Sequence, residues 1–317
     1  MTVSRAINTP DRVKPETLKR VNEAIKALNY TPDHSAQKMR AKGVIGHKDT
    51  TIAVLALEVA TTPFSVGINH AVEQTANEQG WNSMIFNTLE SSPSQETVER
   101  VLSHKPAGVV FATMGLRQVV VPERLKELPL VLANCYSHDP SIPSYVPDDV
   151  QGQYRGFRHL LSKGYKKPLF IMLNQQQPAV ALRQQGIKTA LSEHQLTMEM
   201  FRWRFMGLPC DYHDTIAIID QALADNYDFD CLVCGNDRVA LVAYMHLHRI
   251  GKAIPQDVAI LGYDNMEEVA ELFVPGLTTI ELPHHELGKQ AALHIIERRQ
   301  QQGLIHVPCP LIERESI

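Results

Sequence analysis

From Thr51 onward, short apolar runs alternate with amphipathic stretches, and this alternation constrains the fold more than any other feature of the sequence. The run 52–57 is apolar at every position and does not alternate with polar residues, which is typical of a parallel strand covered on both faces. Strand and helix then alternate in two consecutive series, the second beginning near Gln151. We therefore predict an α/β fold of two doubly wound lobes, with a ligand cleft at the carboxyl ends of their strands.

The apolar periodicity also places the individual elements. In the first series we expect helices at 64–80 and 95–104, and strands at 52–57, 82–86, 108–112 and 131–133. In the second we expect helices at 151–163, 179–194, 214–226 and 238–249, and strands at 169–173, 202–206, 231–234 and 258–261. A helix at about 286–300 and a final strand near 307–312 follow. With crossings near Leu282 and Gly303, lobe 1 comprises about 49–148 and 283–302, and lobe 2 about 149–282 and 303–317.

Composition limits the class of protein. The 317 residues are 44% hydrophobic, which is enough to bury a core in more than one domain. The sequence contains no apolar run of about 18 residues that could span a membrane, and no apolar signal core follows its N-terminal charges. The five cysteines are an odd number and argue against a disulfide framework. We expect a cytoplasmic protein with no membrane partner.

Motifs for catalysis are missing from the sequence. It has no G-x-S-x-G elbow, no phosphate-binding glycine loop and no H-E-x-x-H helix. Cys231 and Cys234 would face opposite sides of a short buried strand, and no second pair accompanies them. We therefore expect neither an enzyme nor a bound cofactor or metal.

The N-terminal 48 residues differ from the rest of the chain in charge. They carry ten Lys/Arg against four Asp/Glu, whereas the remaining residues carry 21 against 31. Residues 2–8 are predicted to form a short helix and residues 9–11 a turn, and residues 15–28 should form a helix with one apolar face. A cationic head on an acidic body indicates a polyanionic partner for the head, although a solvated helical tail would have the same balance.

Motifs in both parts carry a family resemblance. The head contains T-V-S-R-x-x-N from Thr2, then P-E-T, L-N-Y-x-P-D and S-A-x-x-M-R. The body contains G-N-D-R from Gly235, I-P-Q-D-V-A-I-L-G-Y-D-N from Ile254 and P-G-L-T-T-I from Pro275. Along nearly its whole length the chain resembles LacI/GalR-type transcriptional repressors. The resemblance implies a helix-turn-helix headpiece at 1–32, a hinge helix and linker at 33–48, and an effector-binding domain of the type I periplasmic-binding-protein kind at 49–317.

The resemblance also implies how the head would contact operator DNA. Residues 2–8 would be the recognition helix, in which Arg5 reads a guanine edge while Thr2 and Ser4 contact phosphate. Met39, in a hinge helix that folds only in the dimer on DNA, would push into a minor-groove base step. The implied DNA-binding residues are Thr2, Ser4, Arg5, Asn8, Thr17, Asn29, Tyr30, Ser35, Ala36 and Met39.

One departure from the family pattern concerns the start of the headpiece. Relatives have a helix and a turn before the recognition helix, whereas this sequence begins within the recognition helix. Because a helix-turn-helix needs its first helix to hold the second, residues 1–32 are expected to be a truncated headpiece. A start assigned to an internal methionine and a shortened chain would both produce this pattern.

The implied effector-binding residues are Phe64, Asp148, Arg183, Asn236, Asp264 and His284. Sugar hydroxyls need charged or amide groups beside an apolar surface, and these residue types supply both. Four of them have a plainer interpretation: a surface arginine at 183, turn capping at 236 and 264, and helix packing by Phe64. Asp148 and its neighbour Asp149 could reach the ligand or brace the crossing between lobes.

Together these features imply a sugar-responsive, homodimeric transcriptional repressor that sugar releases from operator DNA. A further set of matches, including A-T-T-P-F-S-V from Ala60 and P-S-Y-V-P-D-D from Pro143, favours control of sucrose-utilisation genes. Sucrose, fructose or a phosphorylated sugar could be the effector, and corepression is not excluded. The alternative is a sugar-binding sensor without DNA-binding activity. A periplasmic transport receptor is disfavoured by the basic head.

Overall fold

The computed structural model describes residues 5–6, 10–28, 50–58, 63–266 and 269–317. The chain divides into two compact units, Met1–Asp49 and Thr50–Ile317. In the smaller unit a 3-10 helix at Pro10–Arg12 takes the place of the predicted turn, and α2 (Pro15–Ala27) begins at a proline. No residue of α2 is buried against the other described residues.

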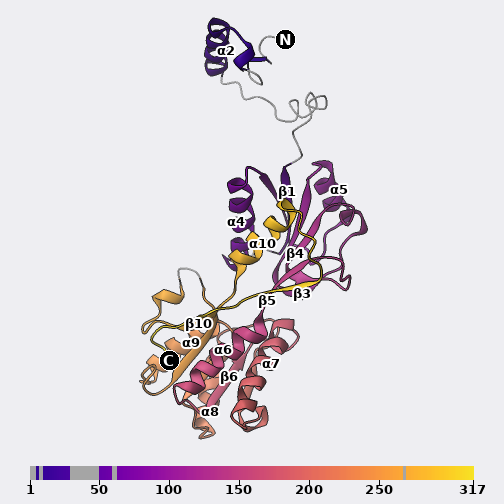
Figure 1. The fold of residues 1–317 in the computed structure, drawn as a ribbon. Helices are drawn as coiled ribbons and strands as arrows, with labels where there is room; N and C mark the ends of the chain where they lie inside the picture. The colour runs from indigo at the N-terminus through magenta and orange to yellow at the C-terminus, as the bar shows by residue number, and fades with distance from the viewer. Residues whose placement is uncertain (1–4, 7–9, 29–49, 59–62, 267–268) are drawn as a thin grey trace. The chain divides into compact units, whose positions relative to one another are not determined.

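The first lobe of the larger unit is a parallel sheet with the strand order β11-β5-β4-β3-β1-β2. Helices α4 and α10 cover one of its faces and α5 covers the other (Figure 1). The strands are β1 (Thr51–Leu57), β2 (Asn82–Thr88), β3 (Gly108–Gln118), β4 (Leu130–Tyr136), β5 (Ser144–Pro147) and β11 (Leu304–Val307); the helices are α4 (Pro63–Glu78), α5 (Gln95–Ser103) and α10 (His284–Ile296).

The second lobe is a sheet with the order β12-β10-β9-β8-β6-β7, parallel except for β12. Helices α6 and α7 cover one face, and α8 and α9 the other. The strands are β6 (Pro168–Met172), β7 (Arg202–Phe205), β8 (Cys231–Cys234), β9 (Ala259–Asp264), β10 (Thr278–Glu281) and β12 (Leu311–Ile312); the helices are α6 (Asp149–Ser162), α7 (Pro178–Glu193), α8 (Asp214–Ala224) and α9 (Asp237–Arg249). Short 3-10 helices occupy Glu123–Leu125, Met198–Met200 and Ala270–Leu272.

Strand β1 shows why these strands lack polar alternation. All of its residues are buried: Ile52, Val54 and Ala56 pack under α4 and α10, while Ala53 and Leu55 pack under α5. Since both faces of the sheet are covered, an apolar residue is needed at every position. This confirms the predicted α/β architecture.

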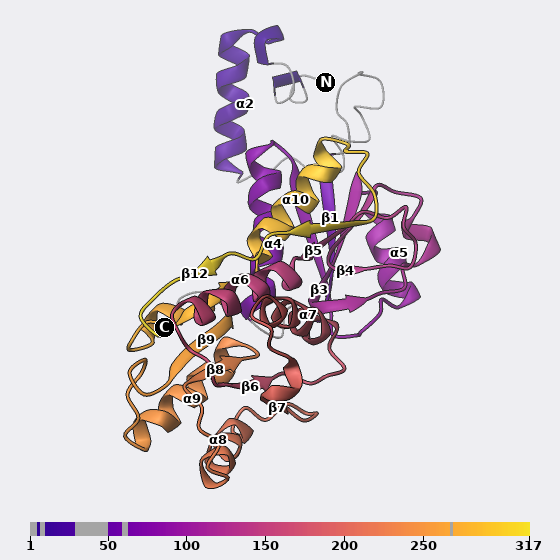
Figure 2. The ribbon, with the colours of Figure 1, turned by 60° about the horizontal axis from the view of Figure 1, so that its bottom comes forward.

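The chain crosses between the lobes from β5 to α6, from β10 to α10 and from β11 to β12. At the junction α7 contacts β3 of the first lobe (Figure 2). The expected return to the second lobe at Gly303 was wrong for residues 304–307, because β11 pairs with β5 of the first sheet. The strand predicted at 307–312 therefore covers the end of β11 and all of β12. Pro308 and Pro310 separate the two strands, because proline has no N–H to continue a ladder. The strands β5 and β10 were not predicted.

Candidate functional site

Arg183 is the centre of a buried polar cluster at the junction of the lobes. It lies on α7, only 4% exposed, and its Nε donates a hydrogen bond of 2.7 Å to Oδ1 of Asp149. Its Nη1 donates a second bond of 2.7 Å to the carbonyl of Gly235, just after β8. The guanidinium carbon lies 3.4 Å from the ring centroid of Tyr263, a close cation–π contact. Arg183 is therefore not the surface arginine that its place on a helix allowed.

The R-x-x-G spacing explains how Arg183 reaches this position. Gly186 lies one turn further along the same face of α7. A Cβ atom there would stand 2.3 Å from the carbonyl oxygen of Val150 and 2.9 Å from the amide of Tyr154. Only glycine lets α7 approach α6 this closely, and the approach brings Arg183 to Asp149 at the start of α6.

The structure separates the roles of the two adjacent aspartates. Asp148 caps α6, since its Oδ1 accepts a hydrogen bond of 3.2 Å from the amide of Gln151. Asp149 is 1% exposed and forms the ion pair with Arg183. Asp148 thus caps the helix that follows the crossing between the lobes, whereas Asp149, absent from the predicted site residues, belongs to the buried cluster.

Asp264 ends β9 with an unusual backbone conformation. Its φ of +118° is strained for any residue with a side chain, and such strain is often found at functional sites. Surrounding bonds hold it there: its carbonyl accepts from the amide of Leu282, and the amide of Met266 donates to Asp237 at 2.8 Å. Burial raises the pKa of the Asp264 carboxyl well above its usual range, and the charge of Arg183 offsets part of this rise.

Asn236 has the capping role that its sequence position allowed. Its Oδ1 accepts a hydrogen bond of 3.0 Å from the amide of Val239, which caps α9. Its Nδ2 donates at 3.2 Å to the hydroxyl of Tyr212. The residue is buried beside Gly235, so the carbonyl that binds Arg183 and this cap belong to one turn.

His284 is the first residue of α10, directly after the crossing from β10. Burial and, to a smaller extent, the charge of Arg183 together lower the pKa of its imidazole to about 4. A neutral imidazole can both donate and accept hydrogen bonds. Phe64 lies in α4, but its side chain is outside the described residues.

Sequence reasoning missed the supporting groups of the cluster. Among the residues that the structure describes, the hydroxyl of Tyr263, Oδ2 of Asp149 and both amide atoms of Gln153 are buried without a hydrogen-bond partner. Asp149 and Gln153 are four residues apart on one face of α6. The double aspartate and the tyrosine before Asp264 were visible signals, whereas nothing in the sequence marked Gln153.

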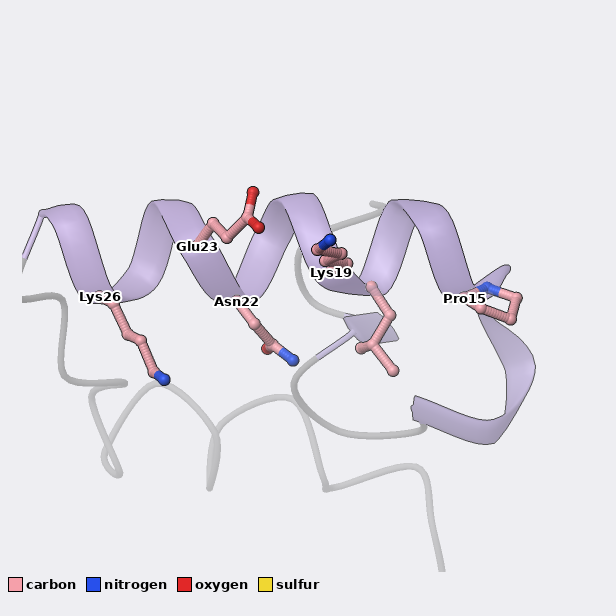
Figure 3. A pocket seen from close by; sticks show the side chains of 6 residues that line it. Pro15, Lys19, Asn22, Glu23 and Lys26 are labelled. Atoms are coloured by element: carbon pink, nitrogen blue, oxygen red, sulfur yellow. The ribbon is translucent and has the colours of Figure 1, made fainter.

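The predicted DNA-binding residues lie mostly outside the described residues: only Arg5 and Thr17 are within them. Arg5 is exposed and helical, and Thr17 is half-buried in the first turns of α2. A surface groove of about 450 Å³ follows one face of α2, as Figure 3 shows. It is lined by Pro15, Leu18, Lys19, Asn22, Glu23 and Lys26. None of these side chains is buried, so the groove has none of the features of a ligand site.

Two other sequence interpretations concern metals and membranes. Cys231 packs under α6 and α7 while Cys234 packs under α8 and α9, on opposite faces of the sheet as predicted. Within the described ranges, no three His, Cys, Asp or Glu side chains are grouped as metal ligands. No helix in those ranges is long and apolar enough to cross a membrane.

The fold and the buried cluster define a two-lobed protein of the periplasmic-binding-protein kind. The family model described as periplasmic binding proteins and sugar binding domain of LacI family matches residues 48–315, and that of bacterial regulatory proteins, lacI family, matches residues 1–33. The chain belongs to the LacI family of bacterial regulators.

Among curated relatives, the chain is 45% identical to the sucrose operon repressor of Escherichia coli over 318 residues, covering 100% of this chain and 95% of that protein. Among solved structures, it resembles a LacI-family transcriptional regulator from Rhizobium etli with a TM-score of 0.79 and 30% identity, over 85% of this chain and 99% of that one. The lac repressor dimer bound to operator and an anti-inducer shares the fold, with a TM-score of 0.76 and 21% identity over 99% of this chain and 94% of that one.

Proposed function

We propose that this protein is a sugar-responsive transcriptional repressor that controls sucrose-utilisation genes and leaves its operator when sugar binds. The observation that carries the proposal is the 45% identity to the sucrose operon repressor along the full chain. The match of the DNA-binding family model to residues 1–33 favours this function over a sensor module without DNA-binding activity. Because its relatives are named repressors, we expect no enzymatic activity.

The domain roles follow from this proposal. Residues 1–32 would be the headpiece, 33–48 the hinge and linker, and 49–317 the effector-binding domain. The protein would act in the cytoplasm as a homodimer on operator DNA, as the lac repressor structure is a dimer bound to operator.

The effector would bind at the lobe junction beside the Arg183 cluster. Asp264, Asn236 and His284 lie around Arg183 at the ends of β8, β9 and β10, where ligands of open α/β sheets bind. In this proposal Phe64 provides a stacking surface for a sugar ring, and Asp148 lies at the edge of the site. Sugar contacts to both lobes would fix their relative orientation and so shift the dimer away from its DNA-binding form.

Calorimetric titration of the full chain with sucrose, fructose, glucose and a purine base tests the sugar-sensor part of the proposal. We expect heat of binding with sucrose or fructose and none with the other ligands of the panel. Binding of the purine base without any sugar, or no binding across the panel, would refute it. Arg183→Met should abolish the sugar signal, while Arg155→Met, at an exposed arginine of the same lobe, should leave it unchanged.

A further inference from the structure

The charge around Asp264 restricts which sugars this site can accept. Two guanidinium groups, those of Arg183 and Arg238, lie close enough to Asp264 to act on its charge. Two further carboxyl groups, those of Asp149 and Asp237, do so as well. Arg314 in turn acts on the charge of Asp237, so three carboxyls lie among three guanidinium groups and each of these guanidiniums has a carboxyl near it.

The guanidinium of Arg183 already binds other groups of the chain. Arg183 gives its Nε to Asp149 and one Nη to the carbonyl of Gly235, each at 2.7 Å, and its face lies on Tyr263. An arginine that binds phosphate usually offers two parallel N–H groups from its fork. Here the buried carboxylate of Asp149 occupies the Nε edge and neutralises the guanidinium charge.

Two helix starts at this end of the second lobe, those of α6 and α9, are occupied by the chain, whereas α7 begins there with no acidic residue in its first turn. A helix N-terminus is the usual backbone site for a phosphate group. Asp148 caps α6, and Asp149 follows in its first turn. Asn236 caps α9, and Asp237 follows in its first turn. The chain's own carboxylates and amide thus take the places that an anion bound at α6 or α9 would need.

The histidine beside the cluster supplies no additional charge. Burial and the neighbouring Arg183 lower the pKa of His284 to about 4, so its imidazole is neutral near pH 7. A neutral imidazole, an amide and a carboxylate suit hydroxyl groups, which can donate to Asp264 and both donate and accept at His284. A phosphate dianion would instead meet the carboxylate of Asp149, which is paired with Arg183, as a like charge.

We propose that the effector of this site is an uncharged sugar, and that its phosphate esters are excluded by the carboxylates around Arg183. This inference rests on the proposed sugar-sensing function. It assigns the repulsion of phosphate to the carboxylate of Asp149, while Asp264 and His284 bind sugar hydroxyls. It also predicts that the regulator responds to the sugar before any phosphorylation step.

The test compares pairs of ligands by calorimetry on the full chain: fructose with fructose 1-phosphate and fructose 6-phosphate, and sucrose with sucrose 6-phosphate. Each ester should bind at least about tenfold more weakly than its parent sugar. Asp149→Asn should narrow the ratio of ester to parent-sugar dissociation constants, because it removes the carboxylate paired with Arg183 at almost constant shape. Asp228→Asn is the matched control: this exposed aspartate, paired with Lys167, precedes β8 at the opposite end of the sheet and should leave the ratio unchanged.

The outcomes separate this inference from the proposed function. Esters that bind as well as or better than the parent sugar would overturn the charge argument while leaving a sugar sensor. The anion would then be expected at the start of α4 or α7, whose first turns have no acidic residue. The charge argument would also be overturned if Asp228→Asn narrowed the difference in affinity between ester and parent sugar by the same factor. Binding by neither sugars nor esters would refute the proposed function and the inference together.

Discussion

Removal of Asp149 should leave a buried cation without its partner, and the cost can be worked from the geometry. The ion pair with Arg183 has an Nε–Oδ1 distance of 2.7 Å, and the two side chains are 5% and 1% exposed. Solvent screening, which reduces exposed pairs to about 0–1 kcal/mol, is therefore absent. Breaking such a buried pair from one side typically costs about 3–5 kcal/mol. We expect Asp149→Ala and Arg183→Met each to lower the free energy of unfolding of the second lobe by that amount.

The double variant provides the decisive comparison. Because neither charge remains in Asp149→Ala/Arg183→Met, its loss should be smaller than the sum of the single losses by about 2–3 kcal/mol. Urea unfolding can be followed by the fluorescence of Trp203, which stacks on Phe170 at 3.8 Å within the second lobe. A Trp81→Phe background removes the other tryptophan, which packs on the first lobe's core. Additive losses in the double variant would refute the view that the two charges stabilise each other.

Other consequences of the structure can be measured separately. Gly186→Ala should destabilise the second lobe by about 1–3 kcal/mol, because its Cβ would meet the Val150 carbonyl, whereas Gly115→Ala, with open space around it, should be nearly neutral in urea unfolding. His284 has a depressed pKa, so the unfolded chain binds its proton first and stability falls as the pH drops from about 6.5 toward 4. His284→Gln should recover about 2 kcal/mol of that loss at pH 5, and an unchanged pH profile would contradict the buried, neutral imidazole. Met245→Glu on α9, where Leu241 and Met245 are exposed on one face, should weaken a homodimer in sedimentation, while Glu73→Gln, at an exposed position of α4, should not. Arg5→Ala should lower operator affinity more than affinity for random DNA, and equal losses would exclude base reading.

The layered architecture could be predicted because the core imposes one rule on every strand. Strands such as β1 and β8 are buried on both faces, and their unbroken apolar runs were recognised with errors of only a residue or two. Strands β5 and β10 escaped because each has only four residues and includes proline, serine, threonine or glutamate. The crossing after β11 was misplaced because nothing local to Gly303 distinguishes a turn within one sheet from a departure to the other.

The candidate site shows the limit of motif reasoning more sharply. Arg183 was identified by its R-x-x-G spacing, and the structure gives that spacing a cause in the close approach of α7 to α6. The sequence could not show which of the two aspartates, Asp148 or Asp149, pairs with Arg183. A shift of one residue at the start of a helix determines whether a carboxylate caps the backbone amides or points into the core. Tyr263 and Gln153 were missed because the role of a polar side chain in a buried segment depends on neighbours that are distant in sequence.

The most direct test of the account is a linkage measurement on the full protein. Sucrose affinity would be measured by calorimetry with and without a saturating operator duplex, and operator affinity with and without saturating sucrose. In a repressor released by sugar, each ligand must weaken the affinity for the other by the same factor, about 5–150-fold. Reciprocal weakening is the result that the account predicts. A sucrose affinity unchanged by operator, in a protein that binds both ligands, would contradict it.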